Sequence, residues 1–177
     1  MIVALLNQKG GVGKTTTAIN LATALAAVGR RVLMFDLDPQ GNASTGLGID
    51  RSRRKLGSYD VIIGAATVAE ATLATEVPGL AAVPSTLDLS AAELELVGIE
   101  RREYRLHDAF AGVGADYDYV LIDCPPALGL LTLNALVAAD SVLVPLQCEF
   151  LALEGLSQLV RTIERIRARF NERLLIQ

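Results

Sequence analysis

The chain has 177 residues, of which 51% are hydrophobic and 20% are charged. This composition excludes disorder and predicts a single domain over residues 1–177 with one sizeable core. Its 16 basic and 20 acidic side chains give a formal net charge of -4, which argues against a strongly basic nucleic-acid-binding module.

Short apolar runs alternate with helical patterns, which is typical of βαβ units. The expected strands, in chain order, are residues 2–6, 31–35, 80–83, 119–122 and 141–145. Between the first two, apolar residues recur at helical spacing over residues 15–28 and stop at Gly29. The pattern predicts an α/β fold, doubly wound around a mainly parallel sheet with helices on both faces.

Three further segments complete the prediction. Residues 153–170 are expected to form an amphipathic surface helix with one apolar face, which consists of Leu153, Leu156, Leu159, Val160, Ile163 and Ile166. A charged stretch interrupts the apolar pattern of residues 90–113, so these form either one long helix or two short ones. Residues 41–60 are rich in Gly, Ser and Arg and are expected to form a loop with at most a short helix.

The two ends of the chain indicate its cellular compartment and whether it is a piece of a longer protein. The apolar start at residues 1–6 becomes polar at Asn7 and has no basic segment before it, unlike a signal peptide. No stretch approaches the roughly 20 apolar residues of a membrane-spanning helix. Residues 174–177 begin like another buried strand, which suggests a piece of a longer protein; a complete edge strand is the alternative. We therefore expect a cytoplasmic domain, truncated at its C-terminal side, with no membrane segment in this chain.

A glycine-rich segment lies between the first expected strand and the first expected helix. It consists of Lys9, Gly10, Gly11, Val12, Gly13, Lys14, Thr15 and Thr16. Glycines let the backbone curl so that its N–H groups face phosphate oxygens, and the following helix adds its positive end. Lys14 is expected to reach the β- and γ-phosphates and the Thr15 hydroxyl to bind Mg²⁺. A turn without a ligand is the weaker alternative.

One departure makes the motif more specific. The general phosphate-loop pattern has glycine where this chain has Gln8, and the chain carries an additional lysine, Lys9. In this deviant Walker A form, the sequence resembles the ParA/Soj branch of the ParA–MinD superfamily of P-loop ATPases. The resemblance implies that Lys9 reaches the nucleotide of a partner subunit, so that two ATP molecules are enclosed in an ATP-dependent homodimer. An ordinary solvated lysine is the alternative.

Acidic residues follow two expected strands, at the edge where open parallel sheets bind ligands. By resemblance, Asp38 matches the aspartate that positions the attacking water, whereas a simple turn opener is the alternative. Asp36 is assigned to the metal environment or to the loop. Asp123 ends the strand 119–122 in a Walker B arrangement and is expected to hold Mg²⁺ through water. Residues 124–126 resemble the family's switch segment, which senses the γ-phosphate.

Several other side chains are open to two interpretations. Asn134 and Glu149 are candidates for the dimer interface or simple hydrogen-bonding residues. Two cysteines, Cys124 and Cys148, are too few for a disulfide framework. Cys124 is interpreted as a packing residue, because no second cluster of ligands makes it a metal or redox site. The lone histidine, His107, is assigned no chemistry. The basic cluster is interpreted as a solvated loop, with contact to DNA phosphates as the alternative; it comprises Arg51, Arg53, Arg54 and Lys55.

The resemblance implies a slow Mg-dependent ATPase, stimulated by a ParB-like partner, that acts in plasmid or chromosome partitioning. Its ATP-bound dimer is expected to bind nonspecific DNA through segments beyond residue 177, and so to associate with the nucleoid. The alternatives are a MinD-like or cellulose-synthesis-associated positioning ATPase and a nucleotide-binding module without turnover. A small-molecule kinase or amidoligase is less well supported, because no acceptor site is evident.

Overall fold

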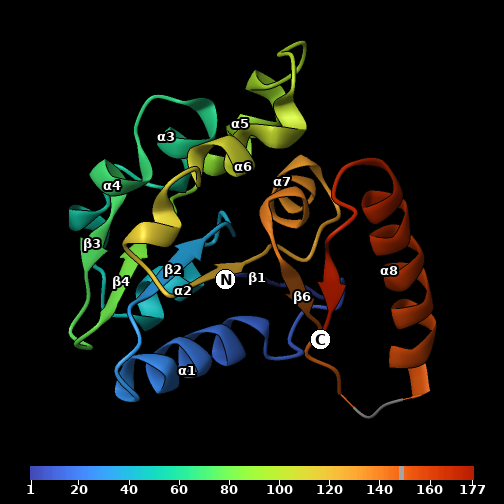
Figure 1. Cartoon of the computed structure of the whole chain (residues 1–177), viewed down its shortest axis with the longest axis horizontal. Coiled ribbons are helices and arrows are strands. Elements are labelled where there is room, and N and C mark those ends of the chain that lie inside the picture. The colour runs from blue at the N-terminus through green and yellow to red at the C-terminus, as the bar shows by residue number, and fades with distance from the viewer. Residues whose placement is uncertain (148–149) are drawn as a thin grey trace.

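The computed structural model describes residues 1–147 and 150–177. Within them, seven strands form one sheet: β1 (Ile2–Leu5), β2 (Val32–Asp36), β3 (Leu73–Ala74), β4 (Leu80–Val83), β5 (Tyr119–Asp123), β6 (Ser141–Leu143) and β7 (Leu175–Ile176). Their order is β3-β4-β2-β5-β1-β6-β7, and every neighbouring pair is parallel except β3 and β4. The predicted α/β fold class is confirmed (Figure 1).

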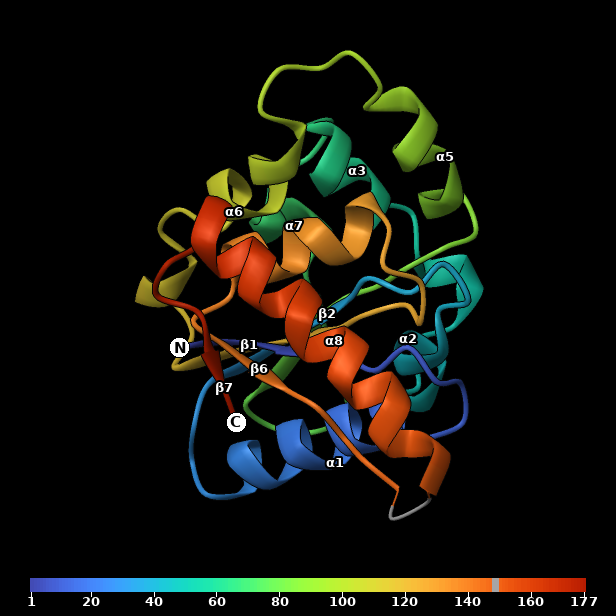
Figure 2. The same cartoon turned by 90° about the vertical axis from the view of Figure 1, so that its right-hand side faces the viewer.

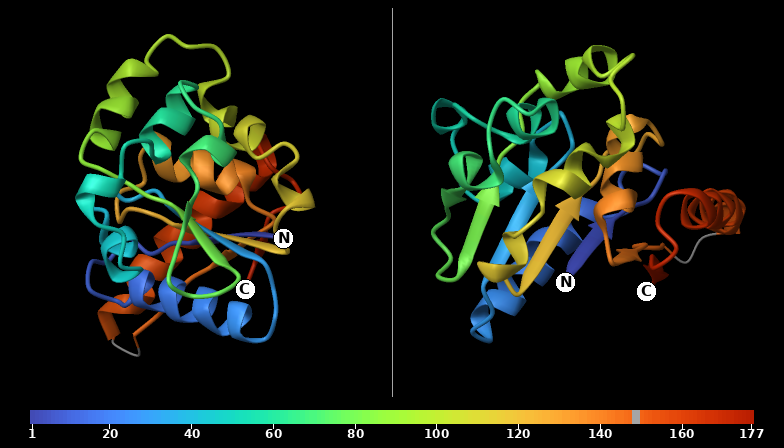
Figure 3. Two further views of the ribbon diagram at one scale, coloured as in Figure 1. Left: turned by 90° about the vertical axis from the view of Figure 1, so that its left-hand side faces the viewer. Right: turned by 45° about the horizontal axis from the view of Figure 1, so that its top comes forward.

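Helices cover both faces of the sheet, as the views from two further sides show (Figure 3). One face carries α1 (Lys14–Ala27) and α2 (Asn42–Gly46). The remaining helices are α3 (Ser58–Ile63), α4 (Val68–Ala71), α5 (Leu89–Glu95), α6 (Arg105–Ala109), α7 (Leu130–Ala138) and α8 (Phe150–Arg169), with 3-10 turns η1 (Arg51–Arg53), η2 (Arg102–Tyr104) and η3 (Val113–Ala115). Most of these pack on the opposite face.

Two hydrophobic cores result, because successive residues of each strand face opposite sides. In β1, Val3 and Leu5 pack toward α1, whereas Ala4 packs toward α7 and α8. With both faces covered, the central strands are buried along nearly their whole length, which accounts for the uninterrupted apolar runs in the sequence.

The expected strands and the first helix are confirmed within a few residues. Residues 90–113 hold short helical pieces rather than one long helix, and positive φ angles at Gly98 (84°) and Arg101 (56°) separate them. The sequence analysis did not predict α3, α4, α7 or the short antiparallel strand β3. The strand expected at residues 174–177 forms as β7, where Leu174 is buried as predicted, but the prediction of burial was wrong for Leu175 and Ile176, which are exposed.

The predicted amphipathic helix forms as α8, which lies in front in Figure 2. Leu159, Ile163 and Ile166 are buried against the core, while Leu153 lies among the residues whose side chains are outside the description. Among the described residues, no helix combines the length and apolar character needed to cross a membrane.

Candidate nucleotide site

The glycine-rich segment follows β1, which lies between β5 and β6 near the middle of the sheet. Its backbone takes positive φ angles at Gly11 (75°) and Gly13 (88°), a conformation that other residues rarely adopt. A Cβ atom added at either glycine would meet no heavy atom within 4 Å, so the glycines are needed for conformation and leave open space above the loop. The helix α1 begins at Lys14, directly after this turn.

Lys14 is folded back onto the loop that precedes it. Its side chain is buried, and its Nζ donates to the carbonyl oxygen of Lys9 at 3.2 Å. The backbone N–H of Lys9 donates to Asn7 Oδ1 at 2.9 Å. The backbone N–H and carbonyl oxygen of Lys9 are thus both hydrogen-bonded, while the residue as a whole is exposed.

Thr15 and Asp123 meet between α1 and β5. The Thr15 hydroxyl donates to Asp123 Oδ2 at 2.7 Å, whereas the buried Oδ1 has no hydrogen-bond partner. Burial raises the pKa of Asp123 to about 7, helped by the nearby Asp36 and Asp38 carboxylates and opposed by the Thr15 hydrogen bond and Lys14. A hydroxyl beside an unsatisfied carboxylate oxygen is a donor set that suits a hard divalent cation such as Mg²⁺.

Asp36 lies beside Asp123 in the register of β2 and β5, but both of its carboxylate oxygens accept hydrogen bonds from protein groups. Oδ2 accepts from the backbone N–H of Ser44 at 2.8 Å and from the Ser44 hydroxyl at 2.5 Å, and Oδ1 accepts from the N–H of Asp38 at 3.3 Å. Burial raises the pKa of Asp36 to about 6, against the lowering effect of Ser44. Of its two predicted roles, the structure supports the loop-holding one.

A cavity of about 790 Å³ joins the predicted elements of the site. It is lined by Gly10, Gly11, Gly13, Lys14, Thr15, Thr16, Ile19, Asp38, Pro39, Gln40, Asn42, Ser90 and Pro126. Its size is within the usual range of small-molecule sites. The cavity brings together the glycine-rich loop, Asp38 and the segment after β5, whereas Lys9, Val12 and Asp123 are not part of the lining. Asn42 and Ser90 carried no signal in the sequence.

The basic cluster divides into exposed residues and one buried residue. Arg54 is buried, and its guanidinium donates to the carbonyl oxygens of Ile49, Gly41 and Ser85 and to Thr45 Oγ1. Both predictions for Arg54, a solvated side chain and a DNA contact, are wrong, because its donors stabilise the loop after β2. Arg51, Arg53 and Lys55 are exposed.

Other predicted positions are resolved by burial. Asn134 is fully buried, where its amide bonds the N–H of Leu106 and the carbonyl oxygens of Arg102 and Leu130, so the interface prediction is wrong for this residue. Cys124 is buried in the larger core, as predicted. His107 is exposed beside Asp108. The predictions for Cys148 and Glu149 lie outside the described residues.

Known proteins share this arrangement of loop, strands and helices. A family model described as "AAA domain" matches residues 1–176. The chromosome partitioning protein ParA of Caulobacter vibrioides is 61% identical over 178 residues, which cover 99% of this chain and 67% of the relative. The chain belongs to the ParA/Soj family. The sporulation initiation inhibitor protein Soj of Bacillus subtilis is 51% identical over 176 residues, or 99% of this chain and 70% of that relative.

A solved structure of this fold carries a nucleotide. Cobyrinic acid a,c-diamide synthase from Mycobacterium smegmatis, with bound ATP analogue and magnesium, has a TM-score of 0.94 and 44% identity, covering 99% of this chain and 71% of that chain. The resemblance to the ParA/Soj branch drawn from the loop residues is confirmed. The chain spans about two thirds of the length of these family members.

Proposed function

We propose that this chain is the nucleotide-binding domain of a ParA-type ATPase, and that it binds and hydrolyses ATP with Mg²⁺. The observation that carries the proposal is the pairing of Thr15 with Asp123, whose second carboxylate oxygen is buried and unpartnered below the phosphate loop. A buried acceptor without a partner costs free energy unless a ligand or water satisfies it. Mg²⁺ held by Thr15, and by Asp123 through water, would satisfy it.

The chain's own residues would bind and orient the nucleotide. The backbone of residues 10–16 would hold the phosphates at the positive end of α1. Lys14 would exchange the carbonyl oxygen of Lys9 for the β- and γ-phosphates. Asp38, whose Oδ1 accepts from the N–H of Gln40 at 3.0 Å, would orient a water in line with the γ-phosphate. Bound Mg²⁺ supplies neutralisation of the phosphate charge.

We expect the ATPase to act as a nucleotide-dependent switch, and a second copy of the chain would complete its active site. Lys9 is exposed and directly precedes Gly10, which lines the cavity, and a residue that acts on a partner's nucleotide has to be exposed near the site. Its ammonium would stabilise charge that develops during phosphoryl transfer, as an arginine finger does. The proposed ATP-dependent homodimer would bind nonspecific DNA, and a ParB-like protein would stimulate its slow hydrolysis during plasmid or chromosome partitioning. The names of the relatives support this role.

The likeness to cobyrinic acid a,c-diamide synthase favours a second candidate, an ATP-dependent amidoligase. The two functions differ in what receives the phosphoryl group, which is water for the switch and a carboxylate substrate for the ligase. Phosphate release from ATP with no added organic acceptor supports the switch. Release that appears only with a carboxylic acid and an ammonia source supports the ligase.

The main test is the molar mass of the chain by light scattering, with Mg-ADP and with Mg-ATP, for the wild type and for Asp38→Ala. The proposal predicts a monomer that doubles only with ATP, and a longer-lived dimer for Asp38→Ala because bound ATP is no longer hydrolysed. A wild type that binds ATP but stays monomeric contradicts the proposed dimer. Normal turnover by Asp38→Ala removes this residue from catalysis.

The two loop lysines have separable roles. Lys14→Ala should abolish nucleotide binding, whereas Lys9→Ala should bind ATP as a monomer. Lys55→Ala, which removes an exposed lysine outside the cavity lining, is the matched control and should behave as the wild type. Unchanged ATP affinity in Lys14→Ala would refute the phosphate-loop assignment, and an intact dimer in Lys9→Ala would refute its role in trans.

A further inference from the structure

Arg54 joins two loops that line the nucleotide cavity. It lies directly after η1 and is only 9% exposed, and arginine is rarely buried without hydrogen-bond partners. Its Nη1 donates to the carbonyl oxygens of Gly41 at 3.4 Å and Ser85 at 3.1 Å. Its Nη2 donates to Thr45 Oγ1 at 2.8 Å. One guanidinium thus holds the loop after β2 against the loop after β4.

Gly41 closes a turn over residues 38–41, which we call the Asp38 turn. The N–H of Gly41 donates to the carbonyl oxygen of Asp38 at 2.9 Å. The carbonyl oxygen of Gly41 also accepts from the Thr45 hydroxyl at 3.0 Å. Arg54 therefore holds both the end of the Asp38 turn and a side chain that bonds to it.

Gly41 and Arg54 are packed closely together. Gly41 has a φ angle of 64°, a conformation that favours glycine. A Cβ atom added there would lie 2.5 Å from Arg54 Nη1 and 2.9 Å from the carbonyl oxygen of Ser85. The guanidinium therefore fills the space beside the Asp38 turn, and its removal would leave the turn room to move toward the loop after β4.

Both loops that Arg54 joins contribute to the wall of the cavity. Asp38 and Asn42 come from the loop after β2, and Ser90 follows shortly after Ser85. In the proposed function, Asp38 orients the attacking water. The rate of such a step depends on exact placement, because a displacement of about 1 Å from the productive geometry can cost about 100-fold. A residue that fixes the Asp38 turn therefore bears on the rate of hydrolysis.

We propose that Arg54 is a positioning residue for ATP hydrolysis, which holds the Asp38 turn so that the Asp38 carboxylate faces the attacking water. The inference rests on the proposed function, in which Asp38 orients that water. Arginine suits this place because its planar fork of donors binds several oxygens at fixed angles, whereas lysine carries one ammonium on a flexible stem. The acceptors of Arg54 lie in the loops after β2 and β4 rather than in the phosphate loop. Arg54 should therefore affect the rate of hydrolysis more than the affinity for ATP.

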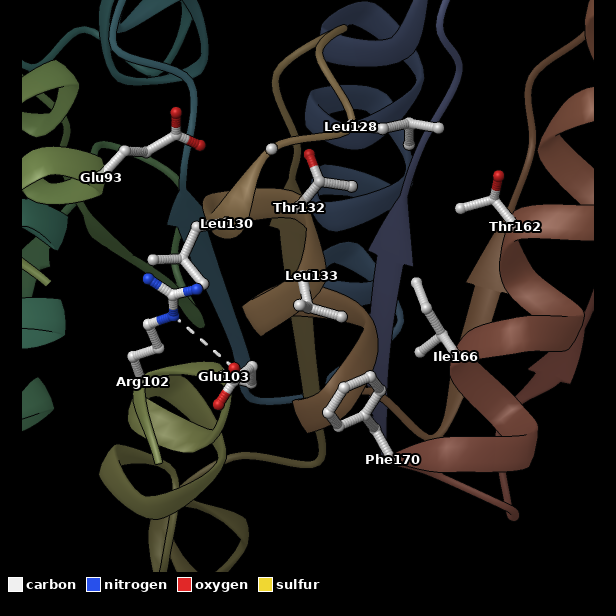
Figure 4. Close-up of a pocket in the computed structure, with 11 residues that line it drawn as sticks. Glu93, Arg102, Glu103, Leu128, Leu130, Thr132, Leu133, Thr162, Ile166 and Phe170 are labelled. Atoms are coloured by element: carbon white, nitrogen blue, oxygen red, sulfur yellow. Dashed lines mark ion pairs between the residues drawn. The ribbon is translucent and has the colours of Figure 1, made fainter. Parts of the chain in front are cut away.

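Two other arginines provide controls, because both lie away from the described lining of the nucleotide cavity. Arg105 Nε donates to the carbonyl oxygen of Ile62 at 2.9 Å, which is the same kind of bond as those of Arg54. Figure 4 shows Arg102 beside a separate hollow of about 490 Å³, where its Nε lies 3.6 Å from Glu103 Oε1. Replacing either arginine removes a guanidinium and its contacts without changing the Asp38 turn.

The experiment measures single-turnover hydrolysis of ATP with Mg²⁺ and, separately, the dissociation constant of a fluorescent ATP analogue. Arg54→Ala should slow hydrolysis about tenfold or more and change the dissociation constant less than about twofold. Arg105→Ala and Arg102→Ala should change neither quantity by more than about twofold. Arg54→Lys, which keeps the charge but loses the fork, should slow hydrolysis less than Arg54→Ala does. If Arg54→Ala does not fold, Arg54→Lys takes its place in every measurement.

A double-mutant cycle with Asp38→Ala separates positioning of Asp38 from a general loosening of the fold. If Arg54 acts through Asp38, adding Arg54→Ala to Asp38→Ala should slow the residual hydrolysis less than about twofold. Equal slowing by Arg54→Ala in both backgrounds, or wild-type rates in both Arg54 variants, overturns this inference and leaves the proposed function standing. Normal hydrolysis by Asp38→Ala instead overturns the role of Asp38 in the proposed function, and this inference with it.

Discussion

The carboxyl ends of β2 and β5 carry two aspartates in the same register, Asp36 and Asp123, in similar surroundings. Both side chains are buried, and burial raises both pKa values, to about 6 for Asp36 and about 7 for Asp123. They differ in their partners, because Asp36 accepts three hydrogen bonds from the loop after β2 while Asp123 accepts one and keeps an unpartnered oxygen. The hydrogen-bond partners of an aspartate, more than its burial or its position in the sheet, therefore distinguish one that stabilises a loop from one that can bind a cation.

The largest effect is expected from Asp123→Asn. This change keeps the shape but removes the charge that would hold Mg²⁺ through water, and such outer-shell changes cost about 10- to 100-fold in activity. Steady-state ATP hydrolysis measured over a range of Mg²⁺ concentrations should show the loss. Asp116→Asn, which alters an exposed aspartate, is the control, and equal activity of the two variants would contradict the assignment.

Asp36→Ala should instead reduce stability. It leaves the N–H and hydroxyl of Ser44 without their buried acceptor, which costs about 2 kcal/mol in the free energy of unfolding. Urea denaturation without nucleotide measures this loss. Asp123→Asn should be neutral or stabilising in the same experiment, because it removes a buried charge with an unpartnered oxygen. An equal loss in the free energy of unfolding in both variants would contradict the different roles assigned to the two aspartates.

The pH dependence of stability should follow from the raised pKa values. Between the unfolded value of 3.8 and the folded values of about 6 and about 7, the native state binds more protons than the unfolded state. Stability of the nucleotide-free protein should therefore fall as pH rises through this window, by at most about 1.4 kcal/mol per pH unit and group. Asp123→Asn should remove the part of the slope between pH 6 and 7. An unchanged slope in that variant would contradict the raised pKa.

A smaller effect is expected for Ser44→Ala. The Ser44 hydroxyl donates to Asp36 and accepts from the N–H of Ser85 at 2.9 Å, so it joins the loops after β2 and β4. Its loss should lower the free energy of unfolding by about 1 kcal/mol, because the backbone N–H of Ser44 still reaches Asp36. Thr86→Ala is a suitable control. Thr86 follows Ser85 in the chain, but its hydroxyl donates only to the exposed Asp88, two residues away.

The sequence predicted best those parts of the structure that depend on residues close together in the chain. The phosphate loop and the strands β1, β2, β4 and β5 could be predicted, because their patterns of glycine and apolar residues lie within short windows. Arg54 could not be assigned, since its acceptors include Ser85, 31 residues away. Asn134 was ambiguous for the same reason, because its partners at Leu106 and Arg102 come from another element. Long-range hydrogen bonds leave no periodic trace in a sequence.

The central position of β1 in the sheet determines the order in which parts of this domain can fold during synthesis. Ile2 pairs in register with Val120, and Val3 with both Leu121 and Ser141. During synthesis the phosphate loop emerges before both neighbours of its strand, because β5 and β6 lie more than a hundred residues further along the chain. Such pairing is slow to form, because the loop it closes is long. Nascent chains that end before β5 should expose an unsupported phosphate loop, so a bound nucleotide can stabilise this domain only after β5 has been made.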